Sequence, residues 1–143
     1  MGYTHYFPQQ RALNDKEWSV IKEDTRKIID HCETNHGIKV QLEYDEAEAP
    51  QIDDTAIHFN GVGGDGHETF RITKALDSSF NFCKTANKPY DLVVGLVLLA
   101  VEEIAPDALR ISSDGEWTEE WDIIRKHFHI LFDEIPRQPK ELT

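Results

Sequence analysis

The fold is decided first by residues 56–73, whose sequence is AIHFNGVGGDGHETFRIT. Two β-prone runs, residues 56–62 and 68–73, flank the glycine-rich connection 63–67. Runs rich in branched and aromatic side chains on either side of a short glycine-rich segment are typical of a β-hairpin. We therefore predict a hairpin with a glycine-rich turn.

Upstream of the hairpin, the sequence predicts two strands and one long helix. Residues 3–7 are aromatic and β-prone, and residues 38–44 alternate apolar and polar side chains, as a half-buried strand does. Between them we expect a helix capped by Asn14 together with Glu17 and ended by Gly37. The side chains that trace its buried face are Trp18, Ile21, Thr25, Ile28 and Cys32. The acidic stretch 45–54 is predicted to be a solvated loop.

Downstream of the hairpin, the pattern becomes mainly helical. A short strand is expected at residues 80–83, and the apolar run 92–104 after Pro89 predicts a buried central helix. Pro106 ends that helix, and a short strand at 109–112 leads into a turn. A last amphipathic helix is predicted by the spacing of Trp117, Trp121, Ile124, Phe128 and Leu131. The polar tail from about residue 136 is expected to fray.

The order of these elements predicts an α+β fold. Strands gather in the first two thirds of the chain and the largest helices in the last third, which favours a mainly antiparallel sheet packed against about three helices. A chain of 143 residues is long enough for one core, and no linker or internal repeat divides it. We expect residues 1–143 to form a single globular domain.

The charge balance restricts the partners. A net charge of −12 opposes binding to duplex DNA, because affinity for polyphosphates depends on Lys and Arg. Solubility is the plainest explanation of this acidity, and mimicry of nucleic acid toward a basic protein is the alternative. The longest apolar run, residues 92–101, is about half of the ~20 residues that a membrane span requires, so we expect no membrane partner.

Cysteine usage and the first residues predict a cytoplasmic protein. Cys32 and Cys83 are the only cysteines, and they lack the framework of small secreted domains. Residues 1–6 lack the basic and apolar regions of a secretion signal. Both observations favour a reducing compartment.

The glycine-rich turn contains a phosphate-binding pattern. Residues 61–66 match G-x-G-x-x-G, in which glycines let backbone N–H groups approach a phosphate. A dinucleotide site requires a helix to follow, whereas residues 67–72 alternate like a strand. The chain also lacks the other motifs of a protein kinase. A tight turn without a ligand and an anion-binding nest both stay open.

A basic segment precedes the central helix. Residues 70–88 carry Arg71, Lys74, Lys84 and Lys88 against Asp77, a local balance of +4 − 1 = +3. Helix N-termini attract anions through free N–H groups and the helix dipole. If the hairpin folds toward this helix, both elements would meet in one pocket. An acidic residue in the first helical turn would compete for the same positive end.

Reactive side chains allow further interpretations. Cys83 could be a nucleophile if a neighbour lowered its pKa, although a buried structural cysteine is the plainer interpretation. His5, His58, His67, Asp65 and Glu68 could supply metal ligands, but no metal-ligand motif connects them. The turn at 112–115 offers hydroxyls and Asp114 for a ligand, or Asp114 or Thr118 for capping the last helix.

Several blocks of the chain resemble a known family. They are residues 1–6 (MGYTHY), 59–63 (FNGVG), 65–70 (DGHETF), 82–86 (FCKTA), 88–91 (KPYD) and 112–115 (SSDG). Together they are similar to a family of small proteins found in bacteriophages, prophages and bacteria. The resemblance implies a phage-like setting and no particular chemistry.

We predict a binding module that holds a small anion or nucleotide at the hairpin and the lysine-rich helix start. The predicted ligand-binding residues are Asn60, Gly63, Gly64, Asp65, His67, Arg71, Lys84, Thr85, Lys88 and Asp114. No cofactor and no metal are expected. In a phage setting, such a protein could sequester a defence signal in the host cytoplasm.

Two other functions remain alternatives. An acidic inhibitor would bind a basic or nucleic-acid-binding host protein through its 45–54 loop. A small enzyme would use Cys83 or His67 for its reaction. Homo-oligomerisation stays open.

Overall fold

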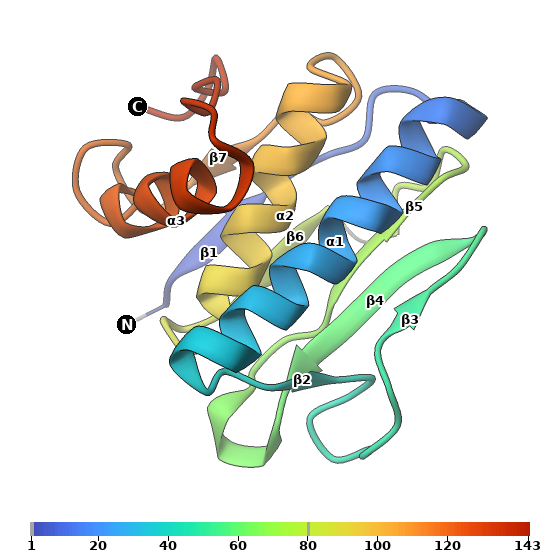
Figure 1. The fold of residues 1–143 in the computed structure, drawn as a ribbon. Coiled ribbons are helices and arrows are strands. Elements are labelled where there is room, and N and C mark those ends of the chain that lie inside the picture. Colours follow the sequence, from blue (N-terminus) through green and yellow to red (C-terminus); the bar gives the residue numbers. More distant parts are fainter. Residues whose placement is uncertain (1, 80) are drawn as a thin grey trace.

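The computed structural model describes residues 2–79 and 81–143, and it confirms a single α+β domain. Figure 1 shows its strands behind two long helices, with a third helix beside them. The helices are α1 (Asp15–His36), α2 (Asp91–Ile104) and α3 (Asp122–Phe132), with a short 3-10 helix η1 (Gly63–Asp65). The strands are β1 (Thr4–Tyr6), β2 (Val40–Gln41), β3 (Gln51–Ile52), β4 (Ala56–Gly61), β5 (Phe70–Thr73), β6 (Phe82–Lys84) and β7 (Ser112–Ser113).

All strand pairs are antiparallel, and they form two sheets. One sheet has the order β6-β1-β7, so the first strand of the chain lies between two late ones. The other has the order β2-β4-β3, with β5 also paired to β4. The predicted hairpin is therefore confirmed, with Phe59 opposite Phe70 next to the glycine-rich turn.

Helix α1 forms as its end signals predict. The Asn14 side chain accepts a hydrogen bond from the Glu17 N–H, and the Glu17 side chain accepts one from the Asn14 N–H, so the capping box is complete. Gly37 ends the helix in the left-handed region with φ +65°, where glycine meets no steric penalty. Its buried residues are those predicted: Trp18, Ile21, Thr25, Ile28 and Cys32.

Helix α2 is the centre of the core. Its residues from Val93 to Glu102 are all buried, which confirms the expectation of a helix apolar nearly all round. It packs against α1 and α3 (Figure 1). Gly95 permits the contact with α3, because a Cβ at this position would lie 2.6 Å from the Ile124 side chain.

Four segments differ from the prediction. The strand expected over 38–44 is reduced to β2, and the acidic loop 45–54 contains β3. This strand forms because Asp53 accepts hydrogen bonds from the N–H groups of Thr55 and Ala56, which turns the chain back onto β4. The expected strand at 80–83 is observed as β6, and residue 80 lies outside the described residues. The expected strand at 109–112 is only the bridge between Leu109 and Gln9, followed by β7.

The last third also differs. Helix α3 begins at Asp122, so Trp117 and Trp121 are buried as predicted but precede the helix, and neither Asp114 nor Thr118 caps it. The tail does not fray as expected, because Leu142 is buried and the Thr143 carbonyl accepts a hydrogen bond from the Trp117 N–H. Pro136 and Pro139 are buried as well, so several apolar side chains of the tail lie against the rest of the domain.

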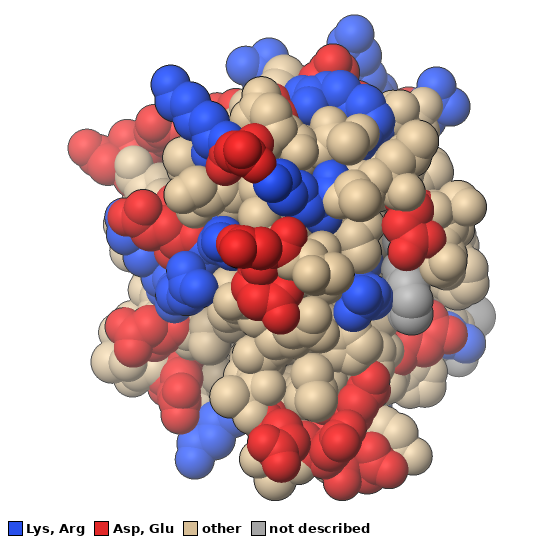
Figure 2. All heavy atoms as spheres, turned by 90° about the vertical axis from the view of Figure 1, so that its right-hand side faces the viewer, with Lys and Arg blue, Asp and Glu red and all other residues tan. Residues whose placement is uncertain are grey.

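Acidic and basic side chains are mixed over most of the face in Figure 2. Acidic side chains gather at its lower end, the level at which Figure 1 places the β2–β3 connection and the glycine-rich turn. Among the described residues, no helix combines the length and apolar character needed to cross a bilayer.

Candidate functional site

The hairpin turn is held by Asn60. Its side chain is fully buried, and its oxygen accepts hydrogen bonds from the N–H groups of Gly61 at 2.7 Å and His67 at 3.0 Å. Its nitrogen donates to the His67 carbonyl at 2.8 Å. Asn60, a predicted ligand-binding residue, therefore uses these groups to close the turn.

A hollow lies beside this turn. It has a volume of about 370 Å³ and is lined by Tyr44, Gly63, Gly66, His67 and Glu68. Of the predicted ligand residues, Gly63 and His67 line it, whereas Gly64 and Asp65 are exposed in the turn but do not line the hollow. The hollow offers backbone and an imidazole, together with the acidic side chain of Glu68.

The hairpin does fold toward the strand that precedes α2. The Glu68 N–H donates to the Lys84 carbonyl at 3.1 Å, and the Glu68 carboxylate accepts from the Lys84 N–H at 2.7 Å. The backbone of Lys84 thus lies beside the chain that follows the turn, but Lys84, Lys88 and Arg71 are not among the residues that line the hollow. Arg71 lies farther along the hairpin, where it contacts His58 at 3.1 Å.

The start of α2 already contains an anionic group. The Asp91 carboxylate accepts hydrogen bonds from the Thr85 hydroxyl at 2.5 Å and from His5 Nε2 at 2.7 Å. Thr85 is fully buried and Lys88 is half-buried. Asp91 in the first turn therefore compensates the positive end of the helix dipole. This is the competition with an external anion that the sequence indicates.

The last predicted ligand residue, Asp114, is exposed, and its carboxylate accepts a hydrogen bond from the Thr4 N–H at 3.0 Å. This hydrogen bond links the start of β1 to the residue that follows β7.

Cys83 lacks the properties of a nucleophile. Its side chain is fully buried, and burial raises the pKa of its thiol to about 12. At neutral pH the reactive thiolate is therefore a minor species. The Sγ atom lies 3.3 Å from the Glu68 carbonyl and 3.8 Å from the Tyr90 hydroxyl. These contacts support the structural interpretation of this cysteine.

Ser113, His5 and Asp91 form a hydrogen-bonded chain that resembles a hydrolase triad in composition. His5 Nδ1 lies 2.8 Å from the Ser113 hydroxyl, and Nε2 lies 2.7 Å from the Asp91 carboxylate. The Ser113 oxygen also accepts hydrogen bonds from the Gly115 N–H and the Trp121 indole N–H. His5 is fully buried, and both lone pairs of the serine are occupied, so this chain is a structural network rather than a nucleophile.

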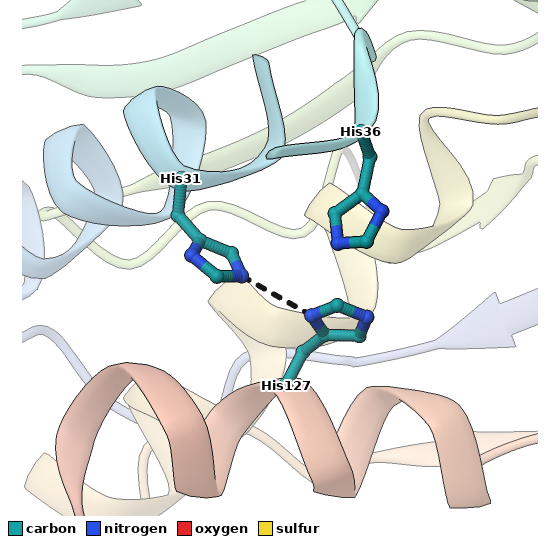
Figure 3. A group of neighbouring side chains, drawn as sticks. All are labelled: His31, His36 and His127. Carbon is teal, nitrogen blue, oxygen red and sulfur yellow. Dashed lines mark hydrogen bonds between the residues drawn. The ribbon is translucent and has the colours of Figure 1, made fainter. Parts of the chain in front are cut away.

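Three histidines meet at the end of α1, as Figure 3 shows. His31 and His36 belong to the last two turns of α1, and His127 lies on α3. His31 Nε2 lies 3.1 Å from His127 Nδ1, and one nitrogen from each of the three rings lies within 4.8 Å of the others. His127 is buried, His31 is half-buried and His36 is exposed.

The environment favours neutral rings. Burial, followed by the proximity of His36, lowers the pKa of both His31 and His127. A neutral imidazole nitrogen carries the lone pair that a metal ion requires. The Asn35 side chain lies 3.0 Å from Nδ1 of His31. The Asn35 atom at this distance is the amide nitrogen, which also donates to the His31 carbonyl at 3.1 Å. Metal binding through Nε2 of His31 therefore requires the ring proton to reside on Nδ1.

Sequence reasoning missed this group. His31 and His36 are five positions apart, whereas helical neighbours are three or four apart. His36 joins the group because it is the last residue of α1, next to the left-handed Gly37. The third member comes from a helix 96 positions away. The signal available in the sequence was the presence of histidines in two helices that were both predicted to pack on the same core.

The histidine-containing set considered from the sequence is not brought together. His5 is enclosed in its own network, and His58 Nε2 lies 2.7 Å from the Glu43 carboxylate. Within residues 2–79 and 81–143, only the three histidines of Figure 3 form a cluster of three candidate ligand side chains.

Comparisons with known proteins add no constraint: no family model, curated protein or solved structure matches the chain.

Proposed function

We propose that the protein binds a divalent transition-metal ion, zinc above all, through His31, His36 and His127. The observation that carries this proposal is the convergence of three imidazoles from two helices, with one nitrogen of each within 4.8 Å of the others. Imidazole is a common ligand of Zn²⁺, Cu²⁺ and Ni²⁺.

The distances fit a tetrahedral ion with one adjustment. Zinc–nitrogen bonds of about 2.0–2.1 Å place tetrahedral ligands about 3.3 Å apart. Nε2 of His31 and Nδ1 of His127 already lie 3.1 Å apart. The His36 nitrogen has to move inward by about 1.5 Å, and the side chain of this residue is exposed.

Three ligands leave one tetrahedral position for water or an external ligand. That open position is the arrangement expected of a metal centre that binds an outside molecule. Binding also joins the end of α1 to α3, so the ion would stabilise the folded chain.

The test is calorimetric titration of metal-stripped protein with zinc chloride at pH 7.5. We expect one ion per chain, and an affinity at least about 100-fold weaker in His36→Ala. His36 is exposed, so this variant keeps the fold. The matched control is His129→Ala. It removes an exposed histidine of α3, the helix that carries His127, and should leave zinc binding unchanged. Equal affinity in His36→Ala and wild type would refute the site.

A second candidate function is the binding of a small anion or nucleotide at the glycine-rich hairpin. Two observations support it: the 370 Å³ hollow beside Gly63 and the contact between the hairpin and Lys84. In the phage setting that the sequence resemblance implies, the ligand would be a host defence signal.

Native mass spectrometry of protein purified from cells tests this second function. We expect a stoichiometric small molecule that is lost in Lys84→Ala and retained in Lys39→Ala, which removes an exposed lysine elsewhere. Protein without a bound molecule would count against the hairpin site and leave the zinc titration unaffected.

A further inference from the structure

A separate cavity lies at the opposite end of α2. Its volume is about 420 Å³, which is within the range of about 300–1,000 Å³ typical of small-molecule sites. Its apolar wall is formed by Pro106, Leu109 and Ile111, and Glu102 reaches it from the last turns of α2. None of the three histidines lines this cavity.

Glu102 is an unusual lining residue. It is only 6% exposed, yet it forms no hydrogen bond or ion pair with any residue in 2–79 and 81–143. Its neighbour Glu103 accepts a hydrogen bond from the Arg137 N–H. Buried carboxylates are normally paired, because an isolated buried charge is costly. Glu102 is therefore a largely buried carboxylate at the wall of the cavity that has no hydrogen-bond partner among the described residues, and the cations that act on it electrostatically are Arg137 and Lys140.

The other charged groups of the cavity are mostly paired. Arg110 Nε lies 3.6 Å from the Glu141 carboxylate, and the Asp107 carboxylate accepts a hydrogen bond from Arg11 at 2.8 Å. Lys140 lines the same cavity but lies beyond ion-pair distance of Glu102. With these pairs set aside, Glu102 on α2 and Lys140 are the charged lining side chains for which the described residues provide no ion pair. A cationic group in the cavity would give the Glu102 carboxylate the close partner that it lacks.

The protonation of Glu102 agrees with this geometry. Burial, and to a lesser extent the adjacent Glu103, raises the pKa of its carboxyl to about 7, while Arg137 and Lys140 act in the opposite direction. Near neutral pH the group can either hold a proton or pair with a cation from outside.

We propose that this cavity binds a small organic cation, an ammonium or guanidinium group on a short apolar body, with Glu102 as its partner. The cationic group would donate hydrogen bonds to the carboxylate, and the apolar body would lie against Leu109 and Ile111. A charge-assisted hydrogen bond to a buried carboxylate is stronger than a neutral one, which gives selectivity for cations over alcohols of the same size.

The experiment is an NMR titration of the full chain with n-butylammonium at pH 8, where Glu102 is mostly ionised. We expect saturable shifts of the backbone amides of residues 102–111. The neutral isostere n-butanol and the anion butyrate are the matched probes, and neither should saturate. In Glu102→Gln, which keeps the shape of the side chain, affinity for n-butylammonium should fall at least about 10-fold.

Three results would overturn the proposal. They are the absence of saturable shifts with n-butylammonium, equal binding of n-butanol, and unchanged affinity in Glu102→Gln. Butyrate binding that is lost in Lys140→Ala would instead identify an anion site and also refute it. The amide spectrum of each variant reports whether the chain is folded, and zinc binding is measured separately.

Discussion

His5 and the cluster of His31, His36 and His127 differ in how their ring nitrogens are used. His5 is fully buried, and its two nitrogens face Ser113 at 2.8 Å and Asp91 at 2.7 Å. In the cluster of Figure 3, by contrast, imidazoles face one another at the edge of the molecule. The nitrogens of His5 face polar side chains of other kinds, whereas in the cluster His31 and His127 are partners of each other, so a metal ion that replaces their mutual hydrogen bond would be bound by both rings.

The difference teaches that burial alone does not identify a functional polar group. His5 is more buried than any member of the cluster, and it is the least available. The useful criterion is whether the protein already satisfies the group. Glu102 meets this criterion and His5 does not.

The largest expected effect is on the His5 network. His5→Ala should lower the free energy of unfolding by about 3 kcal/mol, because it leaves a cavity and removes the partner of Asp91 and Ser113. Urea unfolding at pH 7.5 measures this loss. Zinc affinity of the folded fraction should not change. A loss below about 1 kcal/mol would show that the network is not a stabilising element.

A smaller effect, with the opposite sign, is expected at Glu102. The folded protein holds the Glu102 proton up to about pH 7, above the ordinary value of 4.5, so wild type loses stability as pH rises between these two values. The free energy of unfolding of Glu102→Gln should therefore be roughly 2 kcal/mol larger than that of wild type at pH 8 and equal to it at pH 4. Thermal unfolding at both pH values gives the comparison. The same difference at both would exclude titration as its cause.

The histidine cluster should give the next effect. Because the pKa values of His31 and His127 are lowered in the folded state, the stability they contribute is present above the ordinary histidine pKa and is lost as pH falls below it. We expect wild type to lose about 1 kcal/mol more than His127→Gln between pH 7.5 and 5.5. Parallel urea titrations of metal-free protein test this. An identical acid dependence in both proteins would mean that the cluster does not titrate.

The smallest expected effect concerns the two thiols. Cys32 and Cys83 are both buried and free, and burial raises the pKa of each to about 12. In native protein at pH 8, a disulfide reagent should label them at least about 100-fold more slowly than in urea. Rapid labelling of Cys83 in the native state would restore the nucleophile interpretation.

Local signals in the sequence predicted much of the fold. The capping pair Asn14 and Glu17, the end at Gly37 and the glycine-rich hairpin depend on neighbouring residues, and all are observed. Part of what local signals missed depends on distant contacts. The tail is ordered because Leu142 contacts a core made of residues far away in the sequence. β3, by contrast, follows from the local turn at Asp53, a signal that the acidic composition of the segment concealed.

The candidate site was less predictable, for the same physical reason. The sequence left the approach of the hairpin to Lys84 conditional, and the observed contact is made by the Lys84 backbone. The histidine cluster was not expected, because it requires the packing of α1 against α3. Likewise, Glu102 is not distinguishable from Glu103 in the sequence. Only their positions on α2 make one face a cavity and the other contact Arg137.

The place of β1 in the middle of its sheet has a consequence for the order of assembly. His5 pairs with Ser113, which follows it by 108 positions. At synthesis rates of about 5–20 residues per second, β1 is synthesised roughly 5–20 s before that partner. During this interval Tyr3 and Phe7 are exposed, and the strand presents two unpaired edges. The first strand made is thus among the last to be enclosed, and a chaperone that holds nascent aromatic segments would find its target there.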